Sequence, residues 1–191
     1  MFDVWMAFII AGAYLIGSIP SGYLIARYKG IENIREHGSG NIGATNVARV
    51  LGIKFFFIVF FTDFFKAWLY LLCVAAAGFT QWYLISAAIA LLIGNGCSLF
   101  LGFRGGKAVA TGFGVLAALH PYLLLYLFVS WLVVFALTKT VALASIFFLL
   151  ALPAGSIYLM QDSLPMISFT LFTAAWGIFL HRENIAKLGA L

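Results

Sequence analysis

The sequence predicts an all-α, polytopic membrane protein with about seven transmembrane helices. Of its 191 residues, 64% are hydrophobic and only 9% are charged, and the mean hydropathy is +1.10. An average soluble domain is about 25% charged, so a water-soluble fold would have too few polar groups to cover this much apolar surface. The solvent for most of the chain is therefore lipid.

Long apolar runs give the helices in order. A spanning helix needs about 20 mainly apolar residues. This requirement predicts helices near residues 4–25, 53–78, 82–101, 108–119, 121–138, 141–159 and 164–180. The 108–138 region could be one long helix or two, and Pro121 favours two because it disfavours a helical residue before it. At about 18 Å, the 108–119 helix either stops short of the far side or is sheltered by its neighbours.

Basic residues predict the orientation, because they favour the cytoplasmic side of a membrane. The first loop and its edges hold Arg27, Lys29, Arg35, Arg49 and Lys54. Seven spans place this loop, Arg104, Lys107, Lys139 and the C-terminal segment inside, with the N-terminus outside, whereas six spans would put Lys139 and the C-terminal segment outside. The polar segments expected on the cytoplasmic face are 27–52, 102–107, 139–140 and 181–191.

Several features bound the organisation of the chain. The N-terminus MFDVWMAF has Asp3 and no basic segment before its apolar run, which argues against a cleavable signal peptide. Cys73 and Cys97 lie in apolar surroundings without a CxxC spacing, so we expect buried, inert thiols. The net charge of +5 comes from short basic segments between apolar runs, which suits an anionic leaflet and not nucleic acid. We expect a single integral membrane domain over residues 1–191.

The first polar motif is GSGNIG at 38–43, which has the GxGxxG pattern but no preceding hydrophobic strand, so a dinucleotide site is not expected. Residues 44–49 predict a short helix, and the N-terminus of a helix attracts phosphate. Arg49 lies about one turn along and could reach back with its guanidinium. A flexible surface loop would explain the glycines but not the polar residues. The phosphate-binding candidates are Gly38, Ser39, Gly40, Asn41, Gly43, Thr45, Asn46 and Arg49.

The second polar motif is GFRGGKAVATG at 102–112. It is not a P-loop, because the spacing differs and Ala108 stands where a hydroxyl residue is needed. Glycines and Lys107 at a helix start predict a second anion-binding loop. The alternative, a positive-inside anchor, does not explain the diglycine. The candidates are Arg104, Gly105, Gly106, Lys107 and Thr111.

Three further features involve isolated polar side chains. His181 and Asn184 are three residues apart and share a helical face, so we expect them to contact substrate, although a lone histidine is more often structural. Ser145 either faces the site or packs between helices. Asp63 and Lys66 form an i, i+3 pair at membrane depth, which is either functional or a structural ion pair. No Cys/His cluster has metal-ligand spacing and no G-x-S-x-G elbow is present, so neither a metal nor another cofactor is expected.

Four stretches of the sequence are considered together: GSIPSGYLIA (17–26), GSGNIGATNVAR (38–49), GNGCSLFLGFRGGKAVATG (94–112) and HRENIAKL (181–188). This set resembles the bacterial acyl-phosphate:glycerol-3-phosphate acyltransferases. The resemblance implies a multi-pass enzyme of the bacterial inner membrane with a cytoplasmic active site. It implies transfer of a fatty acyl group from acyl phosphate to glycerol 3-phosphate, giving phosphate and 1-acylglycerol 3-phosphate (lysophosphatidic acid), the first step of phospholipid synthesis. The partners it implies are these two substrates and membrane lipid, with the oligomeric state left open and a monomer among the options.

The resemblance also assigns residues. It places the functional serine and arginine of the first motif at Ser39 and Arg49, the phosphate loop at Gly105, Gly106 and Lys107, and the C-terminal pair at His181 and Asn184. Relatives commonly continue to a glycine and a glutamate where this sequence ends in Gly189-Ala190-Leu191. We expect Glu183 or Glu36 to replace that glutamate, or the reaction to proceed without it.

Two phosphorylated substrates match two loops that each combine glycine with a cation. We expect Ser39 to bind phosphate and not to act as a nucleophile, and either His181 or the substrate's own phosphate to accept the hydroxyl proton. The rival function is a small anion transporter or channel, but transporters often carry inverted repeats and none is evident here. The acyltransferase prediction requires the segments of Arg49, Lys107 and His181 to converge at the inner leaflet.

Overall fold

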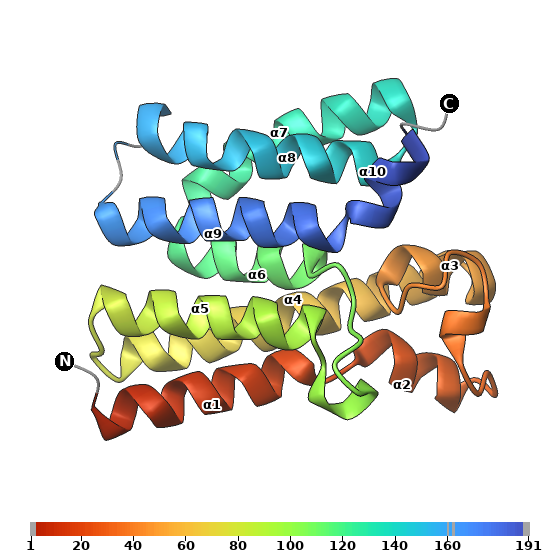
Figure 1. Cartoon of the computed structure of the whole chain (residues 1–191), viewed down its shortest axis with the longest axis horizontal. Coiled ribbons are helices and arrows are strands. Elements are labelled where there is room, and N and C mark those ends of the chain that lie inside the picture. The colour runs from red at the N-terminus through yellow and green to blue at the C-terminus, as the bar shows by residue number, and fades with distance from the viewer. Residues whose placement is uncertain (1–2, 160, 162, 189–191) are drawn as a thin grey trace. The chain divides into compact units, whose positions relative to one another are not determined.

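The computed structural model describes residues 3–159, 161 and 163–188, and all regular structure in these ranges is helical (Figure 1). The elements are α1 (Val4–Ser18), α2 (Ser21–Tyr28), η1 (Ile34–Glu36), α3 (Ala44–Leu51), α4 (Ile53–Ala76), α5 (Gln81–Gly96), η2 (Leu99–Leu101), α6 (Val109–Leu119), α7 (Pro121–Thr138), α8 (Val141–Ala154), the π-helical segment η3 (Gly155–Leu159), α9 (Leu164–Leu180) and α10 (Arg182–Leu188). The predicted all-α class is confirmed.

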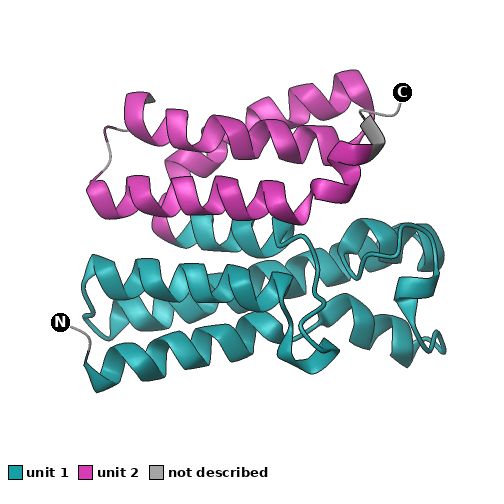
Figure 2. Cartoon of the chain, in the orientation of Figure 1, with its two compact units in different colours: residues 1–118 teal, residues 119–191 magenta. Residues whose placement is uncertain are grey.

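The chain divides into two compact units, residues 1–118 and 119–191 (Figure 2). Within the first unit, α1 packs along α5, and α3 packs on α4. Within the second unit, α8 contacts both α7 and α9.

Five helical stretches of the described chain are long and apolar enough to cross a membrane. They are Val4–Tyr28, Ile53–Ala76, Gln81–Leu101, Pro121–Thr138 and Val141–Tyr158, and two shorter apolar helices are Val109–Leu119 and Leu164–Leu180. The predicted boundaries 121–138 and 164–180 match α7 and α9. The 108–138 region forms two helices, since α6 ends at Leu119 and α7 begins at Pro121. His120 between them caps α7, because its Nδ1 accepts the Leu123 N–H at 3.3 Å.

Three predicted helices differ from the structure. The helix expected over 4–25 is broken between α1 and α2, since Pro20 has no N–H with which to continue α1. The helix expected over 82–101 ends at Gly96, and Leu99–Leu101 forms a separate 3₁₀ turn. The helix expected over 141–159 changes to π-helix after Ala154, next to Pro153.

The prediction of buried thiols is wrong. Cys73 is exposed on α4 and Cys97 is half-buried. Apolar sequence around a cysteine indicates a protein core in a soluble fold, but in a membrane helix it equally indicates a surface that faces lipid.

Small residues bring α1 and α5 together. A Cβ added to Gly17 would overlap the Leu91 carbonyl oxygen, and one added to Gly94 would overlap the Tyr14 carbonyl oxygen. Small residues at a crossing let membrane helices gain packing contacts, which replace the hydrophobic effect that lipid does not provide. The Tyr14 hydroxyl adds a hydrogen bond to the Cys97 carbonyl at 2.9 Å.

The break at Pro20 exposes backbone carbonyls that the chain itself must satisfy. The Lys66 ammonium donates to the carbonyls of Gly17 at 3.2 Å and Ile19 at 2.7 Å. The Ser18 carbonyl, which comes between these two in the chain, accepts a hydrogen bond from the Ser98 hydroxyl at 2.6 Å. An unpaired backbone carbonyl at membrane depth costs several kcal/mol, so these bonds make the break tolerable.

Asp63 completes this network. Its Oδ1 lies 2.7 Å from the Lys66 Nζ and accepts from the Ser21 hydroxyl at 2.8 Å. The side chains of Lys66 and Asp63 are only 9% and 12% exposed. The predicted ion pair is confirmed, and its contacts give it a structural role in joining α4 to the break between α1 and α2.

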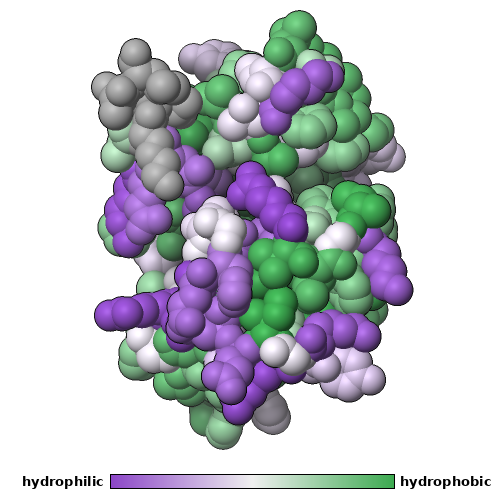
Figure 3. Space-filling model, turned by 90° about the vertical axis from the view of Figure 1, so that its right-hand side faces the viewer, coloured by the Kyte–Doolittle hydropathy of each residue, from purple (hydrophilic) through white to green (hydrophobic). Residues whose placement is uncertain are grey.

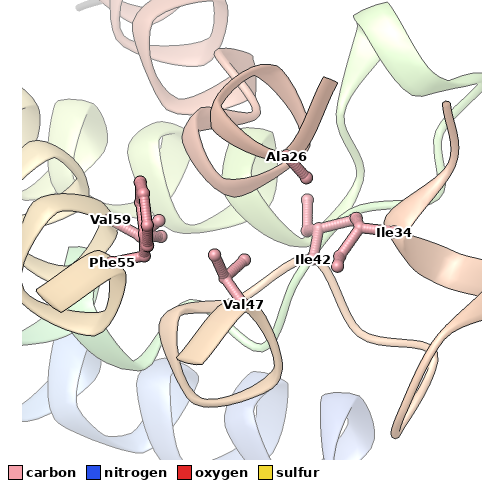
Figure 4. Close-up of a cluster of buried hydrophobic side chains, with 6 residues drawn as sticks. All are labelled: Ala26, Ile34, Ile42, Val47, Phe55 and Val59. Carbon is pink, nitrogen blue, oxygen red and sulfur yellow. The ribbon is translucent and has the colours of Figure 1, made fainter. Parts of the chain in front are cut away.

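A buried apolar cluster holds the polar end of the first unit together (Figure 4). Its members are Ala26, Ile34, Ile42, Val47, Phe55 and Val59. They come from α2, η1, the following loop, α3 and α4, and each is at most 9% exposed. The cluster therefore anchors both ends of the glycine-rich first motif.

We predict that Lys66→Met lowers the free energy of unfolding by about 3–5 kcal/mol, because it removes the cation that pairs with the Asp63 carboxylate and the donor to the Gly17 carbonyl. Unfolding of the purified protein in detergent measures this change. The matched control is Lys54→Met on the same helix, where the side chain is exposed and the expected change is within about 0.5 kcal/mol. Equal effects of the two variants would contradict the proposed role of the network.

Candidate functional site

The first glycine motif is organised by a buried amide. Asn46 is 1% exposed. Its Oδ1 accepts the Ser39 N–H at 2.7 Å, and its Nδ2 donates to the carbonyls of His37 at 2.9 Å and Asn41 at 2.8 Å, with a longer contact of 3.4 Å to Ile34. The Asn46 amide therefore pairs with the backbone of the loop and shapes it, and its predicted contact with phosphate stays a prediction.

The glycines of this motif have two distinct roles. Gly38 and Gly40 have φ values of +60° and +74°, a region that favours glycine. Gly43 precedes α3, and its N–H donates to the Asn41 side chain at 2.7 Å. The Asn41 side chain therefore also helps to shape the loop.

The predicted helix after the motif is confirmed as α3. Asn46 and Val47 both donate their N–H groups to the Gly43 carbonyl, at 3.0 and 3.2 Å. In the part of the chain that the structure describes, no acceptor pairs with the N–H groups of Ala44 and Thr45. The start of α3 thus offers two backbone donors, and the side chains of Ser39 and Arg49 are exposed near the same loop.

The second glycine motif closes back onto the end of α5. Gly105 donates its N–H to the Gly96 carbonyl at 3.0 Å, and Gly106 donates to the Asn95 carbonyl at 2.8 Å. A Cβ added to Gly105 would overlap the Asn95 carbonyl oxygen. In this structure both N–H groups therefore pair with the end of α5, and the glycines let the two backbones approach closely. Phosphate binding by this loop stays a prediction.

Asn95 is a site residue that sequence reasoning missed. It is 7% exposed, and its Oδ1 accepts the Ala108 N–H at 3.1 Å. The sequence does contain a signal, because a single polar residue stands between two glycines at the end of an apolar helix. Such a residue indicates a backbone contact at the helix end.

The structure brings the two glycine motifs together. A Cβ on Gly106 would lie 3.4 Å from the Ile42 Cγ1 and 3.9 Å from the Asn41 Oδ1. Hydrophilic residues gather over the α2 and α3 end of the first unit, in the lower part of Figure 3, with a hydrophobic patch among them. The exposed Arg104 and the half-buried Lys107 belong to the second of these loops.

Thr111 lies on α6 and is fully buried. Its Oγ1 has no hydrogen-bond partner among the described residues. Because the side chain is fully buried, its exposure does not support the predicted contact with substrate.

The second unit holds the remaining candidates. His181 follows α9, is 2% exposed, and has its Nδ1 2.8 Å from the Gly177 carbonyl. Asn184 is half-buried, and its N–H donates to the His181 carbonyl at 2.8 Å. Ser145 is 3% exposed and accepts the Trp131 Nε1–H at 3.3 Å. This contact joins α8 to α7 and supports the alternative that Ser145 packs between helices.

The tautomer of His181 follows from its partner. A carbonyl oxygen can only accept, so Nδ1 must carry a proton. In a neutral ring the basic nitrogen is then Nε2. Among the described residues, no group of three His, Cys, Asp or Glu side chains could hold a metal ion.

A family model described as glycerol-3-phosphate acyltransferase matches residues 7–190. The chain belongs to this family. Among its relatives, the glycerol-3-phosphate acyltransferase of Aquifex aeolicus is 40% identical over 184 residues, covering 95% of this chain and 94% of the relative. That of Desulforudis audaxviator is 43% identical over 181 residues, covering 94% of this chain and 90% of the relative.

Solved structures of the family agree with this assignment. The glycerol 3-phosphate form of PlsY (YgiH), an integral membrane glycerol 3-phosphate acyltransferase, is 37% identical and superposes with a TM-score of 0.91, covering 97% of this chain and 92% of PlsY. The lysophosphatidic acid form of PlsY gives a TM-score of 0.89 at the same identity and coverage. This acyltransferase chain is therefore a multi-pass integral membrane enzyme.

We predict that Gly105→Ala reduces the activity of this acyltransferase by at least about tenfold, because the added methyl group overlaps backbone that cannot rotate away. Steady-state kinetics of the purified variant test this. The matched control is Gly112→Ala on α6, where the added Cβ meets only the Leu92 Cδ2 at 3.8 Å and activity should stay within about twofold of wild type. Normal activity of Gly105→Ala would show that the contact between loop and helix is not needed.

Proposed function

We propose that this chain transfers a fatty acyl group from acyl phosphate to glycerol 3-phosphate, giving 1-acylglycerol 3-phosphate and phosphate. The observation that carries the proposal is the likeness to PlsY, which was solved in a glycerol 3-phosphate form and a lysophosphatidic acid form. These two ligands differ by one acyl group, so they stand on the two sides of such a transfer. A transporter function is not supported, because the family consists of acyltransferases.

The meeting of two loops supports a site that handles two phosphates. The start of α3 offers two N–H groups that have no acceptor among the described residues, and Arg49 is exposed one turn further along. The second loop contributes Arg104 and Lys107 beside the first loop. Helix N-termini and guanidinium groups both favour phosphate, so one loop for each phosphate is the simplest arrangement.

The chemistry places modest demands on the protein, because acyl phosphate is a mixed anhydride with a good leaving group. The C1 hydroxyl of glycerol 3-phosphate attacks the acyl carbonyl, a C–O bond forms, and the bond to phosphate breaks. Holding the hydroxyl next to the carbonyl lowers the barrier by up to about 7–11 kcal/mol. Lys107 and Arg49 stabilise negative charge on the carbonyl oxygen and the departing phosphate, and Ser39 binds phosphate and forms no acyl-enzyme.

The hydroxyl proton goes either to His181 or to the phosphate of the donor. His181 is a suitable base, because its bond to Gly177 places the proton on Nδ1 and leaves Nε2 as the basic atom. Asn184 follows it on α10 and would orient the substrate.

The proposed topology follows from charge and length. The structure has five long apolar stretches and two shorter apolar helices among the described residues. We propose that all seven cross the membrane, which would place the N-terminus outside and the C-terminal segment in the cytoplasm. The site would then face the cytoplasm from the bacterial inner membrane, within a single integral membrane domain. The donor is close to lipid in this arrangement, so its acyl chain would lie in the bilayer-facing part of the protein.

We predict that Arg49→Ala and Lys107→Ala each lower kcat/KM by about 100-fold or more, because each removes a cation that binds phosphate or transition-state charge. The assay uses purified protein, labelled glycerol 3-phosphate and synthetic acyl phosphate, with lysophosphatidic acid as the product. The control is Arg27→Ala, an exposed cation at the end of α2, which should remain within about twofold of wild type. A uniform loss in all three variants would indicate a general effect of positive charge.

His181→Ala separates the two candidate bases. If His181 accepts the proton, kcat should fall by about 100-fold or more. Because the side chain is buried, thermal unfolding of the variant must first show an intact fold. A fall in kcat of less than about tenfold would leave the donor phosphate as the base.

A further inference from the structure

Asn95 holds the backbone on both sides of Lys107. Its main-chain carbonyl accepts the Gly106 N–H at 2.8 Å, and its side-chain Oδ1 accepts the Ala108 N–H at 3.1 Å. Residue 107 lies between these two anchored amides. Asn95 itself is fixed at the end of α5 and is 7% exposed.

Ala108 needs such support. Its φ is +56°, a left-handed conformation that residues with a Cβ rarely adopt. The Ala108 carbonyl accepts the Gly112 N–H at 2.7 Å, so this residue turns the chain from the loop into α6. If Ala108 relaxed to an ordinary φ, the backbone of Lys107 would point in a different direction.

The chemistry of the contact explains an amide at position 95. Because a backbone N–H can only donate, the atom that faces Ala108 must be Oδ1. A carboxylate could also accept this bond, but it would place a negative charge next to the lysine and to any phosphate nearby. Asparagine provides the acceptor without that charge.

We propose that Asn95 is a positioning residue for the acyl transfer: by bonding to both neighbours of Lys107, it fixes the direction in which that ammonium is presented to phosphate. This inference rests on the proposed function, because Lys107 is the group through which Asn95 acts. Asn95 need not touch either substrate.

The test combines a loss with a designed rescue. Asn95→Ala should lower kcat/KM by about tenfold or more through a higher KM, while the midpoint of thermal unfolding stays near that of wild type. Adding Ala108→Gly should recover at least threefold of the loss, because glycine adopts a positive φ without help from a side chain. Ala108→Gly alone should be close to wild type.

Lys139→Gly is the matched control for the rescue. Lys139 ends α7 with a φ of +53°, so this change relieves a similar strain away from the loop and should not rescue Asn95→Ala. Rescue by Lys139→Gly, no rescue by Ala108→Gly, or wild-type kinetics of Asn95→Ala would each overturn the proposal. If Asn95→Ala does not fold, Asn95→Ser takes its place, since its hydroxyl is too short to reach the Ala108 N–H.

Hydrogen exchange separates this inference from the proposed function. In Asn95→Ala, amides 105–110 should exchange faster than in wild type and the α1 and α5 amides should not, and Ala108→Gly should restore slow exchange. If the wild-type protein makes no lysophosphatidic acid, the proposed function fails, and unchanged exchange in Asn95→Ala would still overturn the positioning role.

Discussion

Inside a bilayer, every backbone N–H and C=O that a helix end releases must find a partner within the protein. This constraint shapes the polar end of the first unit at two places. Lys66 and Ser98 pair with the carbonyls released where Pro20 breaks the first helix. The N–H groups of Gly105 and Gly106 pair with the carbonyls released at the end of α5. The hydrogen bonds of Gly105 and Gly106 also hold the loop that carries Lys107, so the same bonds pair the backbone groups and shape the candidate site.

Two buried amides set the shape of the candidate site. Asn46 fixes the loop that carries Ser39, and Asn95 fixes the loop that carries Lys107. Neither side chain is more than 7% exposed. An amide suits this task because it offers both donors and an acceptor without a charge. In the proposed function the exposed cations meet the phosphorylated substrates, so the polar residues of the two motifs would divide into those that shape the loops and those that bind.

Much of the fold could be predicted because apolar runs of membrane length have few alternatives to a helix. α7 begins at Pro121 and ends just before Lys139, and α9 covers the apolar run from Leu164 to Leu180, as the sequence predicts. The errors share one cause, which is that hydropathy does not record backbone hydrogen bonds. The break at Pro20 and the end of α5 at Gly96 therefore lay inside apolar stretches that were expected to continue. The exposed Cys73 has a related cause, because hydropathy does not distinguish core from lipid-facing surface.

The sequence by itself determined that the chain is an all-helical membrane protein, that Asp63 and Lys66 form a pair three residues apart, and that Ser39, Arg49 and Lys107 lie in glycine-rich polar motifs. These conclusions need only composition and spacing along one element. Only the tertiary structure decided that the two motifs meet at Gly106 and Asn41, and that Gly105 is a glycine for close packing. It also decided that Asn46 and Asn95 shape loops, because a side chain can be distinguished as a ligand or a scaffold only when the partners of its polar atoms are known.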